Sequence, residues 1–233
     1  MEDMQMSERL LTPQKYLLPE EISRFRQVLD REAKIGFSCG HQAPVKDAII
    51  LHTILGAGLR VSESAALRVG DLILVYGKAE IFIHKSKNDK SRIVKIGQDL
   101  KKRLKRYLKW KREQGEPMEE ESPLFISRLG KSFSTRGIQK KFHVYMDKAG
   151  IEKDCGIHAL RHTFGLLLYS SSGHNLRMVQ KQLGHSSPSI TQIYADVLES
   201  DTQEAVDKMF DISLQSKIRK AWEADKSNLC EVE

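Results

Sequence analysis

Cysteine is scarce in this chain, and long apolar runs are missing from it. The 233 residues include three cysteines, Cys39, Cys155 and Cys230. They are odd in number and far apart, which argues against a disulfide framework. No apolar run approaches the roughly 20 residues that cross a bilayer, and the acidic, polar start of the chain does not resemble a signal peptide. We therefore expect a soluble cytoplasmic protein without a membrane partner.

Residues that bind zinc are also sparse. Cys39 lies near His41, and Cys155 lies near His158, so the chain contains two conceivable halves of a zinc site. Structural zinc sites are four-coordinate and use closely spaced ligand pairs, and this spacing matches no such module. The sequence therefore predicts no metal site.

Acidic residues are few in one particular stretch. Between Lys85 and Arg112 there are 13 Lys or Arg and two Asp, a local charge of +11, whereas the whole chain carries +7. The remainder of the chain therefore sums to −4. A basic block beside a mildly acidic remainder is typical of a protein that binds a polyanion. A solvated, lysine-rich helix face has the same composition, so charge alone leaves both interpretations open.

Hydrophobic periodicity predicts mostly helices with one small antiparallel sheet, an α+β fold. Apolar residues recur at helical spacing over most of the chain, and Ser62 is predicted to cap a short helix. Short β-branched runs between Gly, Asn and Lys turns favour a meander of strands. Other helices are expected to start at Pro19 and His158, to span 45–59 and 98–114, and to follow Ser134 and Asn175, with a final short helix that carries Tyr194. The expected strands cover 71–76, 79–83, 92–96 and 124–126, and a loop covers 37–44.

The most informative stretch lies between His158 and Tyr194. His158 and Arg161 are three apart, so they share a face of the predicted helix. His185 follows Arg161 by 24 residues, and Tyr194 comes nine residues after His185. Arg and His can donate hydrogen bonds to phosphate oxygens, and Tyr supplies an oxygen nucleophile that can become covalently attached. The pattern favours attack by a phenol on a phosphodiester.

Three motifs together resemble the catalytic half of the tyrosine recombinase (phage integrase) family, in its Xer-like form. They are GAGLRVSESAAL around Arg60, HALRHTF around Arg161, and LGHSS followed by Tyr194. The resemblance implies the mostly helical catalytic fold of that family, with its small antiparallel sheet. It also implies a catalytic set in which Tyr194 is the nucleophile, consisting of Arg60, His158, Arg161, His185 and Tyr194.

The family adds a lysine to this set. The segment SKNDKSRIVKIG resembles the family pattern GKGNKERxVPL, which places Lys87 at the lysine that reaches the DNA near the cleaved phosphate. Lys85 and Lys90 are the alternatives for this role. Within the family, the basic block also implies phosphate contacts, and the candidates are Lys85, Lys90, Arg92, Lys101, Lys102 and Arg103.

The resemblance implies a site-specific recombinase that cleaves and rejoins double-stranded DNA through a 3′-phosphotyrosyl intermediate. Tyr194 attacks the phosphodiester, His158 accepts its proton, and Lys87 protonates the departing 5′-oxygen as a general acid. Because the bond energy stays in the covalent link, neither ATP nor any other cofactor is expected.

The resemblance covers residues 18–200, which we expect to form one catalytic domain. Residues 1–17 are expected to be an N-terminal arm, and residues 201–233 a helical C-terminal tail. Most members of the family carry a further N-terminal core-binding domain, and the arm is too short to be one. The chain is therefore expected to be a minimal recombinase, one that relies on an accessory or partner recombinase, or a fragment.

The tail bears on assembly. In the family the segment after the tyrosine often docks on a neighbouring subunit, which implies a homo-oligomer, a tetramer on DNA; docking on its own domain is the alternative.

Two other functions share part of the pattern: a type IB topoisomerase-like enzyme, and a non-catalytic DNA-binding accessory or regulatory protein. The residues of the motifs LGHSS and HALRH favour a recombinase over a topoisomerase-like enzyme. The full set of catalytic side chains argues against the second.

Overall fold

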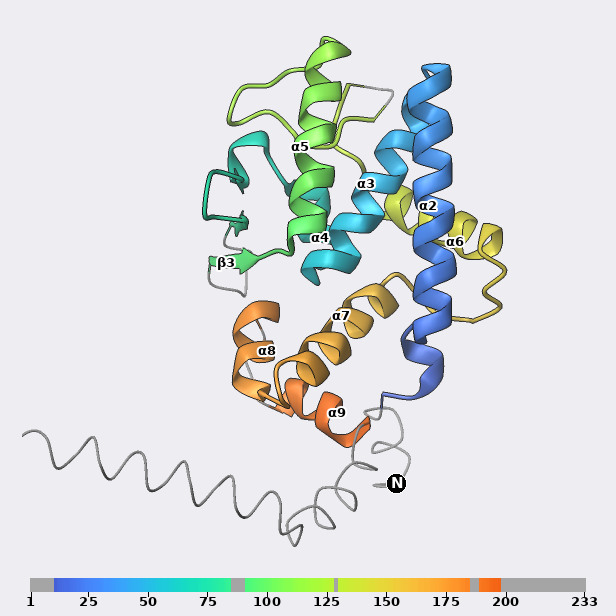
Figure 1. The fold of residues 1–233 in the computed structure, drawn as a ribbon, viewed down its shortest axis with the longest axis vertical. Helices are drawn as coiled ribbons and strands as arrows, with labels where there is room; N and C mark the ends of the chain where they lie inside the picture. The colour runs from blue at the N-terminus through green and yellow to red at the C-terminus, as the bar shows by residue number, and fades with distance from the viewer. Residues whose placement is uncertain (1–10, 85–90, 128–129, 185–188, 198–233) are drawn as a thin grey trace, which may run out of the picture.

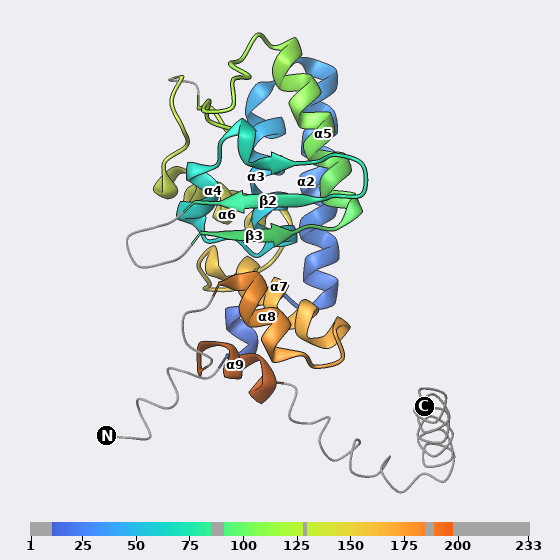
Figure 2. The ribbon, with the colours of Figure 1, turned by 90° about the vertical axis from the view of Figure 1, so that its left-hand side faces the viewer.

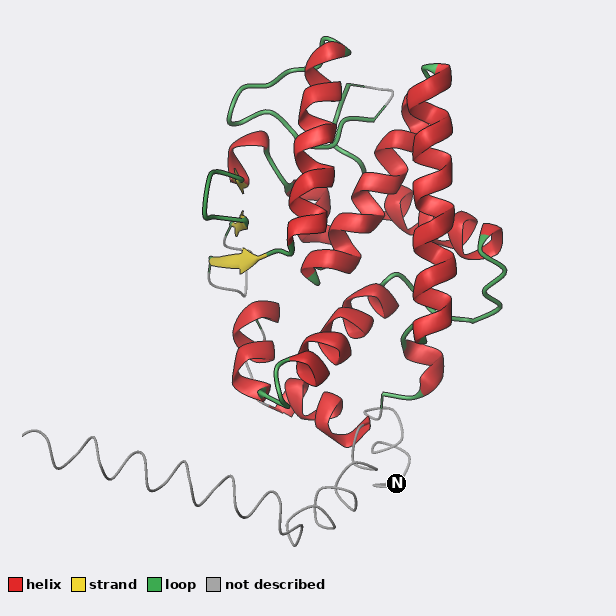
Figure 3. Cartoon of the chain, viewed as in Figure 1, coloured by secondary structure: helices red, strands yellow, loops and turns green. Residues whose placement is uncertain are grey.

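The computed structural model describes residues 11–84, 91–127, 130–184 and 189–197, and these are mostly helical with a small sheet on one side (Figures 1 and 3). The predicted α+β class is confirmed. None of the helices in these ranges has both the length and the apolar character needed to cross a membrane. The helices are α2 (Pro19–Cys39), α3 (Gln42–Ala57), α4 (Val61–Ala66), α5 (Gln98–Glu113), α6 (Thr135–Lys148), α7 (His158–Ser171), α8 (Leu176–Leu183) and α9 (Ser189–Val197), with short 3-10 turns η1 (Pro13–Lys15) and η2 (Val69–Asp71).

Helix α3 runs through the middle of the structure (Figure 1). Residues 45–55 are all buried, because the sequence VKDAIILHTIL offers apolar side chains in every direction around the helix. Helices α2, α5, α6 and α7 all pack against it. Gly58 ends α3 in the left-handed conformation at φ 65°, and its N–H donates to the Ile54 carbonyl. This turn delivers Arg60 to the start of α4.

The predicted loop over 37–44 is wrong. Helix α2 continues to Cys39 and α3 already begins at Gln42, so only Gly40 and His41 connect the two helices. Gly40 adopts φ 71°, a left-handed helix end that reverses the chain within two residues. Pro44 lies in the first turn of α3, where backbone N–H groups have no acceptor within the helix, so proline, which lacks an N–H, is tolerated there. The same Gly and Pro that suggested a loop are therefore a helix end and a helix start.

The strands form a three-stranded antiparallel sheet in the order β1-β2-β3 (Figure 2). They are β1 (Leu72–Ile73), β2 (Glu80–Ile83) and β3 (Arg92–Lys95), shorter than predicted. Ile81 pairs with Val94, and both face the core, whereas Ile93 on the outer face is 51% exposed. The expected strand over 124–126 is wrong: Ile126 makes an isolated bridge to Ser132.

Helices α7, α8 and α9 gather at one end of the structure around a second, smaller apolar cluster (Figure 1). Part of the expected N-terminal arm packs there as well. The Leu17 N–H donates to Thr163 Oγ1 at 2.8 Å, and Lys153 Nζ donates to the carbonyls of Pro13 and Tyr16 at 2.9 and 3.0 Å. The buried members of the cluster are Leu11, Tyr169, Val179, Leu183 and Tyr194.

Candidate active site

Three arginines from three different elements surround one buried carboxylate, that of Glu63. Glu63 accepts the Arg60 backbone N–H and Arg60 Nη1, each at 2.9 Å. It also accepts Arg92 Nη1 at 2.7 Å and Arg92 Nη2 at 2.9 Å, and Arg161 Nη1 lies 3.9 Å away. Burial alone would raise the pKa of Glu63, but the hydrogen bonds and charge of Arg92 hold that pKa below its ordinary value. One negative charge is thus shared among three positive ones, and the cluster is net positive.

Arg161 is buried and fixed at two points. Its Nη1 donates to the Gly58 carbonyl at 2.7 Å, and its Nη2 donates to the Leu183 carbonyl at 2.8 Å. Burial, reinforced by the positive charge of Arg60, lowers the pKa of Arg161 to about 10. The guanidinium therefore stays cationic at neutral pH, and its place depends on the ends of α3 and α8.

His158, the first residue of α7, is exposed beside these arginines. Desolvation, together with the positive charges of Arg161 and Arg60, holds the pKa of His158 below its ordinary value. The imidazole is therefore mostly neutral at pH 7 and can accept a proton or donate one hydrogen bond. The structure thus brings Arg60 together with His158 and Arg161, which lie about a hundred residues later in the sequence.

Tyr194, on α9, is completely buried. Its ring lies against α7: the hydroxyl is 3.4 Å from His162 Nδ1, and a Cβ added to Gly165 would lie 2.5 Å from Tyr194 Cζ. Burial raises the pKa of Tyr194 to about 12, against the opposing effect of the Arg161 charge. The phenol is protonated at neutral pH and needs a proton acceptor before it can act as a nucleophile. The His162 imidazole is within hydrogen-bonding distance of this hydroxyl.

The close fit of Tyr194 on α7 makes Gly165 sensitive to substitution. A Gly to Ala change inside a helix normally stabilises it by up to about 1 kcal/mol, but here the added carbon would press on the buried Tyr194 ring. We expect Gly165→Ala to lower the free energy of unfolding by about 1–3 kcal/mol, measured by urea denaturation. In Gly97→Ala, a control at the N-cap of α5, the new Cβ meets nothing within 4 Å. Equal or higher stability of Gly165→Ala would contradict this packing.

The environment of His162 predicts an acid-side loss of stability. Burial, with the charges of His158 and Arg161, lowers the pKa of His162 to about 4, whereas an unfolded histidine titrates near pH 6.5. Between these values the unfolded chain binds more protons, so the free energy of unfolding decreases as the pH falls from about 6.5 towards 4. We expect His162→Gln to lose less stability over this range. The pKa values of His52 and His158 are also lowered in the folded protein, and these two histidines are present in the variant as well as in the wild type. The contribution of His162 is therefore read from the difference between the two proteins. Equal changes of the urea midpoint with pH in both would contradict the prediction.

The other predicted catalytic residues, Lys87 and His185, lie outside the described residues, as do Lys85 and Lys90. Their roles stay predictions. A hollow of about 290 Å³ opens beside Glu63 and is lined in addition by Ser62, Arg68, Asp71 and His84, among others. It lies where β2 ends, next to the arginine cluster.

Among the predicted DNA contacts, Arg92 is bound within the protein by Glu63, and its side chain is 11% exposed. Lys101 Nζ donates to the carbonyls of Val75 and Lys78, both at 2.6 Å, and so supports the turn between β1 and β2. Lys102 is exposed. The structure therefore gives Arg92 and Lys101 internal partners, while Lys102 points to solvent.

Arg103, also predicted to contact DNA, belongs to a partly exposed network between α2, α3 and α5. Its Nε donates to Asp99 Oδ2 at 2.9 Å and its Nη2 to Asp30 Oδ2 at 3.1 Å. Asp30 Oδ1 is also 3.0 Å from His52 Nε2. The two carboxylates raise the pKa of Arg103 despite its burial, which opposes this. This guanidinium joins three helices.

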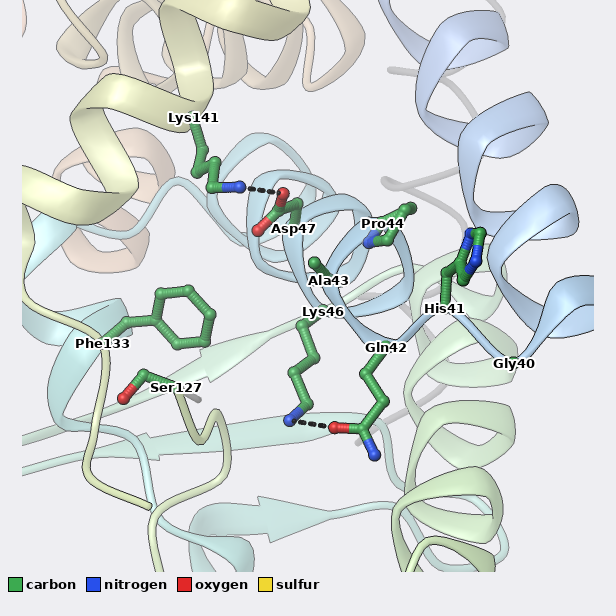
Figure 4. Close-up of a pocket in the computed structure, with 10 residues that line it drawn as sticks. All are labelled: Gly40, His41, Gln42, Ala43, Pro44, Lys46, Asp47, Ser127, Phe133 and Lys141. Atoms are coloured by element: carbon green, nitrogen blue, oxygen red, sulfur yellow. Dashed lines mark hydrogen bonds and ion pairs between the residues drawn. The ribbon is translucent and has the colours of Figure 1, made fainter. Parts of the chain in front are cut away.

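A second hollow, of about 960 Å³, lies at the start of α3, away from the arginine cluster (Figure 4). Its charged side chains have partners: Lys141 Nζ lies 2.8 Å from Asp47 Oδ2, and Lys46 Nζ lies 2.5 Å from Glu116 Oε1 and donates to Gln42 Oε1 at 3.2 Å. Within the described ranges, no three His, Cys, Asp or Glu side chains come together as a metal site would require.

Comparison with known proteins identifies the group to which this site belongs. The sequence profile of the Phage integrase family matches residues 15–201. The chain belongs to the phage integrase family. Curated relatives include the tyrosine recombinase XerC of Thermodesulfovibrio yellowstonii, 35% identical over 175 residues, which is 74% of this chain and 57% of the relative. The tyrosine recombinase XerD of Staphylococcus epidermidis is 36% identical over 159 residues, 68% of this chain and 52% of the relative.

Solved structures of the family have the same fold. The crystal structure of XerA recombinase matches with a TM-score of 0.66 and 28% identity, covering 84% of this chain and 65% of that one. The XerH site-specific recombinase bound to difH substrate matches with a TM-score of 0.64 and 28% identity, covering 81% of this chain and 52% of that one. This phage integrase chain thus spans about half the length of the curated relatives that it matches.

Glu63 is the residue of this phage integrase site that sequence reasoning undervalued. We predicted Ser62 as the N-cap of α4, which is wrong: Arg60 is the N-cap, and Glu63 at the third helical position accepts its N–H. A Glu at that position is a known helix-start signal, so the sequence carried the cue. What it did not reveal is that Arg92, 29 residues away, binds the same carboxylate.

Proposed function

We propose that this chain is the catalytic part of a site-specific recombinase that cuts and rejoins double-stranded DNA through a 3′-phosphotyrosyl link. The observation that carries the proposal is the arginine cluster around Glu63 within electrostatic reach of Tyr194. The charge of Arg161 lowers the pKa of Tyr194, and Tyr194 raises the pKa of Arg161. The arginine cluster and the phenol therefore interact electrostatically. Guanidinium groups suit the charge that develops on a phosphate during in-line attack.

The chemistry proposed is a transfer of the phosphoryl group from one oxygen to another. Arg60 and Arg161 bind the non-bridging oxygens. Tyr194 Oη forms a bond to phosphorus while the bond from phosphorus to the 5′-oxygen breaks. The phenolic proton passes to His158, or to His162 at the 3.4 Å seen here, and Lys87 gives a proton to the 5′-oxygen. Rejoining reverses these steps with a 5′-hydroxyl of another strand, so no cofactor is consumed.

Burial of Tyr194 has a mechanistic consequence. A hydroxyl with no exposed surface cannot contact a DNA phosphate, so α9 has to shift from the position seen here before attack. Among the described residues, α9 packs mainly on α7 and α8 and within the small apolar cluster, and the shift would change these contacts. In the proposal, DNA binding supplies the free energy for this shift.

We propose the same domain arrangement as from the sequence: a catalytic domain over 18–200, an N-terminal arm, and a tail over 201–233 that docks on a neighbouring subunit in a tetramer on DNA. A relative named XerC, another named XerD, and a structure of XerH bound to difH support a DNA partner. Since those relatives are longer, an accessory or partner recombinase is part of the proposal.

Covalent trapping tests the function. The protein is incubated with nicked, randomised duplexes that lose a short 5′-hydroxyl strand after cleavage, which prevents rejoining. We expect a protein–DNA band that survives SDS, and sequencing of the trapped DNA gives the preferred site. Salt-sensitive binding without any such band, also in the presence of a partner recombinase, would overturn the proposed activity.

A further inference from the structure

Strand β3 lies at the edge of the sheet, and helix α8 closes that edge at one residue. An edge strand leaves alternate N–H and C=O groups without a strand partner. At Lys95 both groups are taken up by one side chain: the Lys95 N–H donates to Gln182 Oε1 at 3.3 Å, and Gln182 Nε2 donates to the Lys95 carbonyl at 2.5 Å. The Gln182 amide thus replaces a peptide group of a missing strand and ties α8 to β3.

The two residues after Gln182 hold the arginine cluster. The Leu183 carbonyl accepts Arg161 Nη2 at 2.8 Å. Gly184, at φ 72°, lies so close to Arg92 that an added Cβ would be 2.7 Å from its Cδ. Arg92 Nε also donates to the Gln182 carbonyl at 3.4 Å. Three consecutive residues at the end of α8 therefore contact the sheet edge, Arg161 and Arg92 in turn.

We propose that Gln182 is a positioning residue for the DNA-cleavage reaction, and that it acts through the Leu183 carbonyl on Arg161; this inference rests on the proposed function. Helix α8 has only eight residues. The hydrogen bonds between Gln182 and Lys95 attach the last turn of α8 to strand β3. The Leu183 carbonyl can therefore hold the Arg161 guanidinium in one place. Lys95 stands where the family pattern quoted above has proline, which has no N–H to donate.

The variant that tests this is Gln182→Met, which keeps the length of the side chain and removes both hydrogen bonds. Lys181→Met is the matched control, since it introduces the same side chain at the exposed neighbouring position. Displacing a reacting group by about 1 Å costs up to about 100-fold in rate. We expect Gln182→Met to slow formation of the covalent adduct by about 10- to 100-fold at saturating DNA, with the Kd for DNA changed less than about twofold. Lys181→Met should match the wild type.

A second substrate separates positioning of Arg161 from a general loss of structure. In it the scissile phosphate carries a methyl group in place of one non-bridging oxygen and is neutral, so it depends less on a guanidinium for charge stabilisation. On this substrate the difference between Gln182→Met and wild type should shrink to less than about threefold.

The outcomes of these experiments separate the positioning role of Gln182 from the proposed function. An unchanged rate for Gln182→Met, an equal loss on both substrates, or a loss confined to the Kd would overturn the positioning role while leaving the proposed function standing. A wild-type protein that forms no adduct on either substrate, also in the presence of a partner recombinase, would overturn the proposed function, and this inference with it.

Discussion

Replacing Tyr194 by phenylalanine is expected to abolish the covalent protein–DNA adduct while leaving DNA binding intact. Only the phenolic oxygen is removed, and Tyr194 is the one tyrosine on α9. Loss of an enzyme's nucleophile costs on the order of 10⁵-fold or more in rate. The hydroxyl makes a 3.4 Å contact with His162, so the free energy of unfolding should change by about 1 kcal/mol or less. The measurement is the yield of SDS-resistant adduct beside the Kd for the same duplex.

Tyr169 provides the control for this experiment. It is buried in the same apolar cluster as Tyr194, so Tyr169→Phe perturbs the same packing without removing the proposed nucleophile. We expect this variant to form the adduct normally. Adduct formation by Tyr194→Phe at the wild-type level would show that another residue attacks the DNA.

Arg161→Lys is expected to lose both activity and stability. A lysine has one ammonium group and cannot span the carbonyls of Gly58 and Leu183, which Arg161 reaches with its two terminal nitrogens. A buried carbonyl left without its donor costs about 1–3 kcal/mol, and loss of one donor to the developing charge costs about 10²- to 10³-fold in rate. The expected result is a slower cleavage rate at saturating DNA together with a lower urea midpoint.

Arg136→Lys is the matched control, because Arg136 is exposed on α6. It should leave both quantities unchanged. If Arg161→Lys loses stability but cleaves at the wild-type rate under conditions where it is folded, Arg161 only supports the fold and the catalytic assignment is wrong.

The parts of the fold that were predictable from the sequence are those set by local patterns. The helix over 98–114 and the helix that follows Ser134 were predicted, and the structure has both, as α5 and as α6 with Ser134 as its N-cap. The error over 37–44 arose because Gly40 and Pro44 serve equally well in a loop or at helix ends. Only the packing of α2 on α3 decides between these, and packing is not a local property.

The candidate site divides in the same way. Motif spacing pointed to Arg60, His158 and Arg161, which the structure brings together. The groups that hold Arg161 come from distant parts of the chain: the Gly58 carbonyl is 103 residues away and the Leu183 carbonyl is 22 residues away. The family resemblance and the basic block placed Arg92 among the predicted DNA contacts, and in the structure Arg92 is bound by Glu63. The local sequence does not indicate whether a basic residue in a basic block contacts DNA or pairs with an acidic side chain of the protein.

The most direct test of the account is to locate the residue attached to DNA. After trapping, nuclease treatment and trypsin digestion, mass spectrometry should find a nucleotide-phosphate on the peptide covering residues 182–208, in which Tyr194 is the one tyrosine. The DNA should be joined through its 3′-phosphate, leaving a free 5′-hydroxyl on the released strand. A modification on a different peptide, or an adduct joined through a 5′-phosphate, would contradict the assignment of Tyr194 and the reaction derived from this site.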